Sequence, residues 1–147
     1  MRNSIVAVIA LGAGLAAASG CGSDREHVGT SCSQDAECYP DVADRTKIQG
    51  TVTCLTKYTG GYCTHTCTSD ADCCATPGEC KTGFKQVCSP FENQTVQYCF
   101  LSCEDGDIAA SPNGGTTDPT AYCQKFAGES LTCRSTGGGG LNRKFCG

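Results

Sequence analysis

Large apolar residues are scarce in this chain. The 127 residues that follow position 20 contain four Leu, two Ile, five Val and five Phe, which together make up about 13% of them. A share of these residues below about 20% usually marks a chain that cannot bury enough apolar surface to fold. We therefore expect a minimal hydrophobic core. Covalent cross-links must then supply the stability that apolar burial does not.

Residues that commonly carry catalysis are also few. The chain has only two histidines, His27 and His65, and it contains no Gly-x-Ser-x-Gly, His-Glu-x-x-His or Cys-x-x-Cys motif. A Ser–His or Cys–His catalytic arrangement therefore has almost no material. We expect a protein that is not an enzyme, with no catalytic residue and no cofactor.

Positive charge is in short supply as well. Beyond position 20 the chain has 10 Lys and Arg against 15 Asp and Glu, a formal net charge of −5. Nucleic acids and anionic membrane surfaces attract basic patches. The balance therefore predicts no nucleic-acid partner and no electrostatic attraction to a membrane.

Cysteine, in contrast, is abundant. There are 15 cysteines, of which Cys21 closes an N-terminal hydrophobic leader and 14 lie beyond it. The leader has Arg2 at its start and an uncharged apolar run over residues 5–18. This run is shorter than the roughly 20 residues that a spanning helix needs. Residues 1–20 are therefore predicted to be a signal peptide.

The end of the leader, Ala18-Ser19-Gly20-Cys21, resembles the lipobox of bacterial lipoproteins, in which small residues precede the cysteine that becomes the mature N-terminus. The resemblance implies that the Cys21 sulfur takes a diacylglycerol and that its amine is acylated, for example with palmitate. Two or three acyl chains hold a protein on a membrane essentially permanently. Gly22, in place of the Asp that retains some lipoproteins, implies the outer membrane if the host is Gram-negative.

Two other interpretations of the leader remain open. Ordinary secretory cleavage after Ala18 would leave Cys21 in a mature chain with 15 thiols, one of them unpaired or paired between chains. An uncleaved anchor is the other. Because disulfides persist in oxidising compartments, the cysteine count agrees with export in either case.

The 14 remaining cysteines fall into three similar groups, within residues 32–66, 67–102 and 103–147, after a lipidated N-terminus and linker over residues 21–31. Each group has four framework cysteines, and the second adds Cys74 and Cys80. An aromatic residue precedes the last cysteine of each group, and acidic residues follow the first. The sequence therefore predicts three repeated modules. The framework cysteines are Cys32, Cys38, Cys54, Cys63; Cys67, Cys73, Cys88, Cys99; and Cys103, Cys123, Cys133, Cys146.

Local patterns predict short β-hairpins and little helix. Residues 51–56 and 95–100 are rich in β-branched and aromatic residues, as short strands are. The segment between the third and fourth cysteines of each group is expected to be a hairpin with an exposed tip, and residues 33–36 and 69–72 are expected to form single polar turns. The fold class is small and disulfide-rich, built from three cysteine-framework modules.

The connectivity is open from sequence, since four cysteines allow three pairings. We favour pairing of the first cysteine with the fourth and the second with the third in each group, with Cys74 paired to Cys80. Each disulfide contributes about 2–4 kcal/mol. The polar stretch 22–31 and the turn-rich insertion 111–119 are expected to be mobile.

The segment from Cys67 to Cys73 is similar to segments in whey-acidic-protein, colipase and Dickkopf-type modules, and Cys32–Cys38 is a looser version. The resemblance implies a disulfide module. Whey-acidic-protein inhibitors place a vicinal cysteine pair five residues after such a segment, whereas Cys74 directly follows Cys73 here. No inhibitory loop is therefore carried over.

Aspartate and histidine side chains are the candidate metal ligands outside the cysteine framework. Asp70 and Asp72 offer two oxygens for calcium, but no EF-hand spacing completes a site, so solvated turn residues are expected. His65 lies between two cysteines at a zinc-like spacing, yet zinc needs reduced thiolates. No metal site is therefore expected, and His65 is predicted to lie on the surface and His27 in the solvated linker. Tyr62, Tyr98 and Phe145 are expected to pack over disulfides.

Together these features predict a non-catalytic, lipid-anchored protein of the cell envelope that acts as a structural or adhesive binding module. Its expected partners are the membrane, through covalent lipid, and an unknown envelope or extracellular protein or polysaccharide. The alternatives are an extracellular protease inhibitor or ligand-capture module, and calcium-dependent adhesion.

Overall fold

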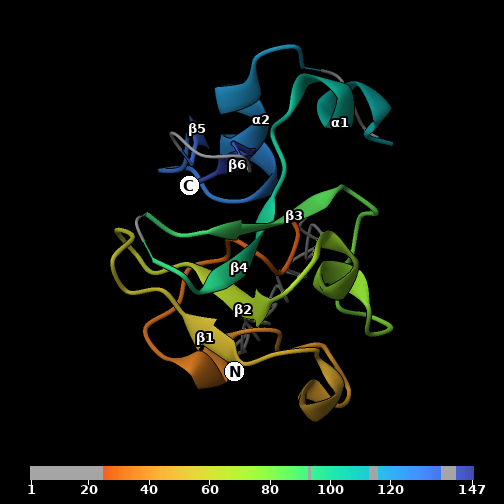
Figure 1. Ribbon diagram of the computed structural model, residues 1–147, viewed down its shortest axis with the longest axis vertical. Coiled ribbons are helices and arrows are strands. Elements are labelled where there is room, and N and C mark those ends of the chain that lie inside the picture. The colour runs from red at the N-terminus through yellow and green to blue at the C-terminus, as the bar shows by residue number, and fades with distance from the viewer. Residues whose placement is uncertain (1–24, 93, 113–115, 137–141) are drawn as a thin grey trace, which may run out of the picture.

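The structure is a computed structural model that describes residues 25–92, 94–112, 116–136 and 142–147 (Figure 1). The predicted signal peptide and lipidation site at Cys21 therefore lie outside the described residues. In these ranges the helices are short, and the six strands are all antiparallel. Strands are β1 (Val52–Cys54), β2 (Cys63–Cys67), β3 (Gln86–Pro90), β4 (Gln97–Leu101), β5 (Cys133–Ser135) and β6 (Lys144–Cys146). Helices are the 3-10 turns η1 (Asp35–Glu37), η2 (Arg45–Lys47) and η3 (Asp70–Cys74), and α1 (Asp105–Ala110) and α2 (Pro119–Phe126).

The strands form three hairpins, β1–β2, β3–β4 and β5–β6, each between the third and fourth cysteine of a group, as predicted. The two cysteines face each other directly in every hairpin: Cys54 opposite Cys63, Cys88 opposite Cys99, and Cys133 opposite Cys146. Directly opposite residues in an antiparallel pair point to the same face of the sheet. Each hairpin therefore presents two sulfurs on one face.

The hairpins are joined to one another. Strands β2 and β4 pair, so the first two hairpins make one four-stranded sheet of order β1-β2-β4-β3. The third hairpin makes a separate two-stranded sheet, and an isolated bridge between Ser102 and Phe145 links it to the end of β4. The described part of the chain is therefore cross-connected through backbone pairing as well as through sulfur.

The predicted turns at residues 33–36 and 69–72 coincide with η1 and η3. Ser69 and Asp72 form a capping box at the start of η3, in which each side chain accepts a backbone N–H of the other residue. The only α-helices among the described residues lie in the third group. Asp118 caps α2 by accepting the backbone N–H groups of Thr120 and Ala121, and Pro119 occupies its first turn.

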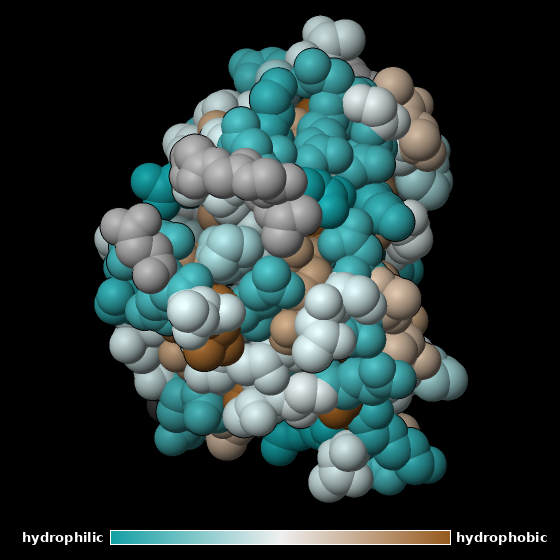
Figure 2. All heavy atoms as spheres, viewed as in Figure 1, coloured by the Kyte–Doolittle hydropathy of each residue, from teal (hydrophilic) through white to brown (hydrophobic). Residues whose placement is uncertain are grey.

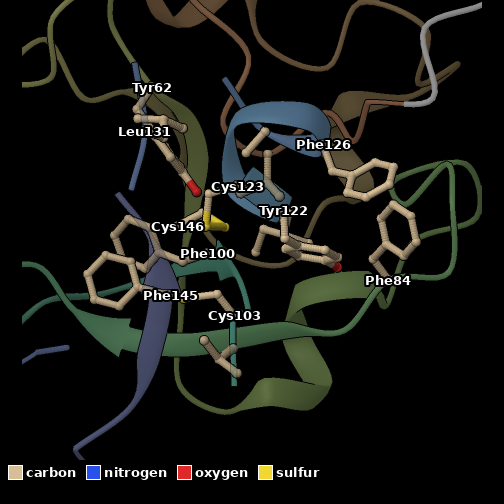
Figure 3. Close-up of a cluster of buried hydrophobic side chains, with 14 of the residues drawn as sticks. Tyr62, Phe84, Phe100, Cys103, Tyr122, Cys123, Phe126, Leu131, Phe145 and Cys146 are labelled. Carbon is tan, nitrogen blue, oxygen red and sulfur yellow. A yellow bond between two sulfur atoms is a disulfide. The ribbon is translucent and has the colours of Figure 1, made fainter. Parts of the chain in front are cut away.

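The hydrophobic core is larger than predicted. One cluster joins 17 buried residues, and aromatic rings dominate it (Figure 3). Within it, the Phe100 ring is stacked on Phe145, with centroids 4.2 Å apart, and its centroid lies 5.3 Å from that of Tyr62. The count of apolar residues missed this core because it left out tyrosine, whose ring buries as much area as phenylalanine.

The surface carries little apolar area. Val96, at 44%, is the one large apolar side chain that is exposed among the described residues. In the view of Figure 2 hydrophobic residues lie in small separate groups among polar ones. Within the described ranges, the structure has no helix that is long and apolar enough to cross a membrane.

Residues 25–31, which we call the N-terminal strap, pack onto the fold instead of forming the mobile linker that was predicted. Glu26, His27 and Val28 are between 0 and 2% exposed. The Gly29 N–H donates to the Cys63 backbone oxygen at 3.0 Å, and the Cys63 N–H donates to Thr30 oxygen at 2.9 Å. The strap is thus held by backbone hydrogen bonds beside the start of β2, for which a polar sequence gives no signal.

Candidate functional site

All 14 framework and added cysteines form disulfides, as predicted, but the predicted connectivity was wrong for the framework. In each group the first cysteine pairs with the third and the second with the fourth, while Cys74 pairs with Cys80 as expected. The framework pairs are Cys32–Cys54, Cys38–Cys63, Cys67–Cys88, Cys73–Cys99, Cys103–Cys133 and Cys123–Cys146.

Acidic side chains explain this pairing in the first two groups. Asp35 lies three residues after Cys32, and its carboxylate accepts the backbone N–H of the third cysteine, Cys54, at 2.7 Å. Asp70 occupies the same place after Cys67 and accepts the N–H of Cys88 at 2.8 Å. Each carboxylate therefore holds the polar turn against the third cysteine and brings the first cysteine to it.

The second acid of each turn also accepts backbone groups. Glu37 accepts the N–H of Ser33 at 2.7 Å, and Asp72 accepts that of Thr68 at 2.7 Å. These acids are turn residues, as predicted, and they hold the turn closed. Among the described residues, the groupings of three or more potential metal ligands are cysteine triplets, and all of these cysteines are in disulfides.

Both histidines lie in one buried cluster beneath the N-terminal strap. His65, on β2, is 0% exposed, and His27, on the strap, is 2% exposed. The predictions of a surface His65 and a solvated His27 were therefore wrong. The strap and the loop closed by the Cys74–Cys80 disulfide cover this part of β2, and the loop contributes Glu79, which is also 0% exposed.

The two ring nitrogens of His65 face a backbone oxygen and a carboxylate oxygen. Its Nδ1 lies 2.7 Å from the backbone oxygen of Gln49, and because a carbonyl oxygen only accepts, Nδ1 carries a proton. Its Nε2 lies 2.6 Å from Glu79 Oε1. The two atoms are within ion-pair distance, but neither is aligned for a hydrogen bond.

Glu79 ties both histidines together. Its second carboxylate oxygen, Oε2, accepts the Thr76 backbone N–H at 2.9 Å. Its backbone oxygen accepts a hydrogen bond from His27 Nδ1 at 2.8 Å. Loss of the Glu79 side chain would therefore leave His65 Nε2 and the Thr76 N–H buried without these partners, which is costly in a protein interior.

Glu26 completes the cluster from the strap. Its carboxylate accepts the backbone N–H groups of Lys81 and Thr82, each at 2.8 Å, and the Thr82 hydroxyl. A buried carboxylate is tolerated when its oxygens accept several hydrogen bonds in this way. The strap is thus fastened to the residues that directly follow Cys80.

Tyr39 fills the space between the two histidine rings, with centroids 5.4 Å from His27 and 5.8 Å from His65. Its φ of 55° lies in the left-handed region, which is unfavourable for an aromatic residue. Burial, with smaller effects of Glu79 and Glu26, raises the pKa of the Tyr39 hydroxyl well above its usual value. The phenol therefore stays neutral in the cluster.

The arrangement of this cluster suits it to hold the N-terminal strap in place. Its ionisable groups come from the strap, β2, the segment at Tyr39 and the Cys74–Cys80 loop, and all are buried. The hydrogen bonds of Glu26, His27 and Glu79 can fix the strap, but a buried set of this kind does not present a base or nucleophile to a substrate in solvent. Sequence reasoning missed the cluster because its members share no spacing.

A second candidate site lies where the tips of the β1–β2 and β3–β4 hairpins contact each other. Lys57, beside the β1–β2 tip, makes an ion pair with Glu92 of the β3–β4 tip at 3.3 Å, and the Tyr58 ring lies 5.1 Å from Phe91. Burial raises the pKa of Tyr58 to about 12. Both tips lie at the left of the view in Figure 1. A hollow of about 270 Å³ is lined there by Lys57, Tyr58, Thr59, Ser130, Leu131, Thr132, Arg134 and Gly147.

The aromatic residues that precede the last cysteine of each group lie in the aromatic core or pack against it. Tyr62 is 0% and Phe145 3% exposed, and both contact Phe100. Tyr98 is half-buried and packs against the same cluster. The expectation of packing over disulfides captured their burial but not this shared aromatic contact. Cys103, Cys123 and Cys146 belong to the cluster (Figure 3).

Comparison with known proteins finds no matching family model, no matching curated protein and no matching solved structure.

Proposed function

We propose that this protein is a non-catalytic, lipid-anchored component of the cell envelope, which holds a rigid disulfide-bonded body close to the membrane and binds other envelope or extracellular proteins, or polysaccharide, through its hairpin tips. The signal peptide would end at Gly20 and the lipid would attach to Cys21. The outer membrane is the expected location in a Gram-negative host.

The observation that carries this proposal is the attachment of the N-terminal strap to the body. Cys21 and Arg25 are four positions apart. An extended chain spans at most about 3.6 Å per residue, so this connection reaches roughly 14 Å. Because the strap is fastened by Glu26 and His27, a lipid on Cys21 would hold the folded body near the bilayer instead of on a long tether.

The course of the strap supports display of the tips away from the anchor. Its first part is hydrogen-bonded to the turn at Lys81 and Thr82 through Glu26. Cys32, the residue that follows the strap, lies at the β1–β2 tip, where its backbone N–H donates to Gly60 oxygen at 3.0 Å. The anchor and this tip would therefore lie at opposite ends of the strap.

We also propose that the three cysteine groups are repeated modules. The pairing of first with third and second with fourth cysteine in every group supports a common origin. The acid-to-third-cysteine hydrogen bond recurs in the first two groups, through Asp35 and Asp70. The third group replaces the polar turn with two helices, which makes it the most diverged module.

Capture of partners from detergent-solubilised envelopes by the native lipidated protein tests the binding role. We expect specific partners that are lost with the charge reversal Lys57→Glu at the tips. Lys85→Glu is the matched control, because Lys85 is also exposed and lies at the other end of the β3–β4 hairpin. Equal recovery of every captured component by all three proteins would contradict binding through the tips.

A further inference from the structure

The Cys74–Cys80 disulfide differs from the other six in its exposure. Cys74 is exposed and Cys80 half-buried, whereas ten of the remaining twelve paired cysteines are buried and Cys67 and Cys133 are half-buried. No other cysteine among the residues that the structure describes from Arg25 onward is exposed. Among the described cysteines, Cys74 is therefore the residue that a thiol in solution reaches most easily.

The loop that this disulfide closes is also the smallest. Cys74 and Cys80 are six positions apart, whereas the other pairs are separated by 21 to 30 positions. In the chain-entropy description, a disulfide stabilises the folded protein more when it closes a longer loop. Opening of the Cys74–Cys80 bond therefore sacrifices the least of this stabilisation.

The surroundings of Cys80 favour it as a leaving group. The side-chain amide of Gln86, which is 3% exposed, places Nε2 3.0 Å from Cys80 Sγ. A nearby N–H donor stabilises a thiolate over a thiol. The backbone oxygen of Cys73, 3.3 Å from the same sulfur, can accept the S–H once Cys80 is protonated.

We propose that the Cys74–Cys80 disulfide is a thiol–disulfide exchange site for small thiols, and that its opening loosens the buried cluster beneath the N-terminal strap. The thiolate of the incoming thiol attacks Cys74 Sγ and forms a new S–S bond with it. The Cys74–Cys80 bond breaks, Cys80 leaves as a thiolate, and that thiolate takes a proton from water. A second thiol then releases Cys74, so that two electrons pass from two thiols to the protein disulfide.

The coupling to the strap runs through Glu79. This residue lies inside the disulfide loop, directly before Cys80, and contacts His65 at 2.6 Å and His27 at 2.8 Å. The residue after Cys80, Lys81, donates its N–H to Glu26 of the strap. Glu79 inside the disulfide loop and Lys81 directly after it therefore make the two contacts that hold the strap. The proposal does not depend on lipid attachment.

The exchange site is tested on the full mature chain with Cys21→Ser, so that no other thiol is present. The protein is treated with limiting dithiothreitol, quenched, alkylated and mapped by mass spectrometry. We expect Cys74 and Cys80 to be labelled roughly tenfold faster than any other pair. Gln86→Leu should slow this phase. First labelling at another disulfide, or simultaneous labelling of all 14 cysteines, would overturn the proposal.

Treatment with glutathione shows which of the two sulfurs, Cys74 Sγ or Cys80 Sγ, the incoming thiolate attacks. We expect the mixed disulfide on Cys74, whereas an adduct on Cys80 would contradict the assigned direction of attack. The double variant Cys74→Ser/Cys80→Ser, which keeps the other six disulfides, should lose the fast phase completely.

Amide hydrogen exchange in the same double variant tests the coupling. The N–H groups of Gly29 and Cys63 should exchange roughly tenfold faster than in the parent, because they hold the strap. The Tyr122 N–H in α2 serves as the control and should be unchanged. Unchanged exchange at Gly29 and Cys63 would overturn the coupling, whatever the labelling experiment gives.

Discussion

The His65–Glu79 contact joins two fully buried side chains, while the Arg25–Glu129 pair lies in solvent. We predict that Glu79→Ala lowers the free energy of unfolding by about 3–5 kcal/mol, because the variant leaves a buried partner without compensation. Denaturant unfolding with intact disulfides measures this loss.

The matched control for this prediction is Glu129→Ala. Glu129 is 87% exposed in its pair with Arg25, and exposed pairs contribute about 0–1 kcal/mol. Equal losses in the two variants would show that the buried cluster does not stabilise the protein.

Asp72 is predicted to make the stability of the folded protein depend on pH. The Thr68 hydroxyl and the backbone N–H groups of Thr68 and Ser69 hold the pKa of Asp72 below its ordinary value of 3.8. The carboxylate therefore contributes stability that is present above this value and is lost as the pH falls through the lower, folded pKa. Midpoints of thermal unfolding for wild type and Asp72→Asn should converge below pH 3.8. A constant difference between them at all pH values would refute this role.

At the scale of single elements, substitutions at two neighbouring glycines test whether the β1–β2 tip packs against Cys32. Gly60 and Gly61 both have positive φ, of 83° and 75°. A Cβ on Gly60 would meet open space, whereas one on Gly61 would overlap the backbone oxygen of Cys32. Gly60→Ala should therefore cost only about 1–2 kcal/mol of backbone strain.

Gly61→Ala should cost clearly more than Gly60→Ala, because the tip must also move away from the strap. Unfolding in denaturant compares the two variants. Similar losses would mean that the tip is not seated against Cys32, and would remove one support for the course of the strap.

The elements themselves were largely predictable from sequence. The β-branched runs around Val52 and Val96 and the acidic turns after Cys32 and Cys67 carry local signals, which the hairpins and 3-10 turns follow. The strap carried no such signal, because backbone groups and buried polar side chains hold it. The framework connectivity was missed because it depends on the contacts of Asp35 and Asp70 with cysteines about 20 residues away.

At the scale of the whole molecule, Phe100 joins the three cysteine groups. Its ring contacts Tyr62 of the first group, Phe91 of the second and Phe145 of the third. We predict that Phe100→Ala lowers the free energy of unfolding by about 3–5 kcal/mol. Val96→Ala, at an exposed site, should change it by less than about 0.5 kcal/mol.

The same contacts predict that the three groups unfold together. Calorimetry of the wild-type protein should show one cooperative transition, since the four-stranded sheet and the aromatic cluster cross the group boundaries. Separate transitions for the first two groups and the third would indicate independent modules.

The proposed lipid anchor and the seven disulfides are tested most directly by the intact mass of the mature, membrane-extracted protein, after thiol alkylation with and without prior reduction. The account predicts a chain that begins at an acylated Cys21, takes no label before reduction and takes 14 labels after it. A chain that begins upstream of an unmodified Cys21 and carries a fifteenth thiol would contradict lipid anchoring and indicate a secreted protein.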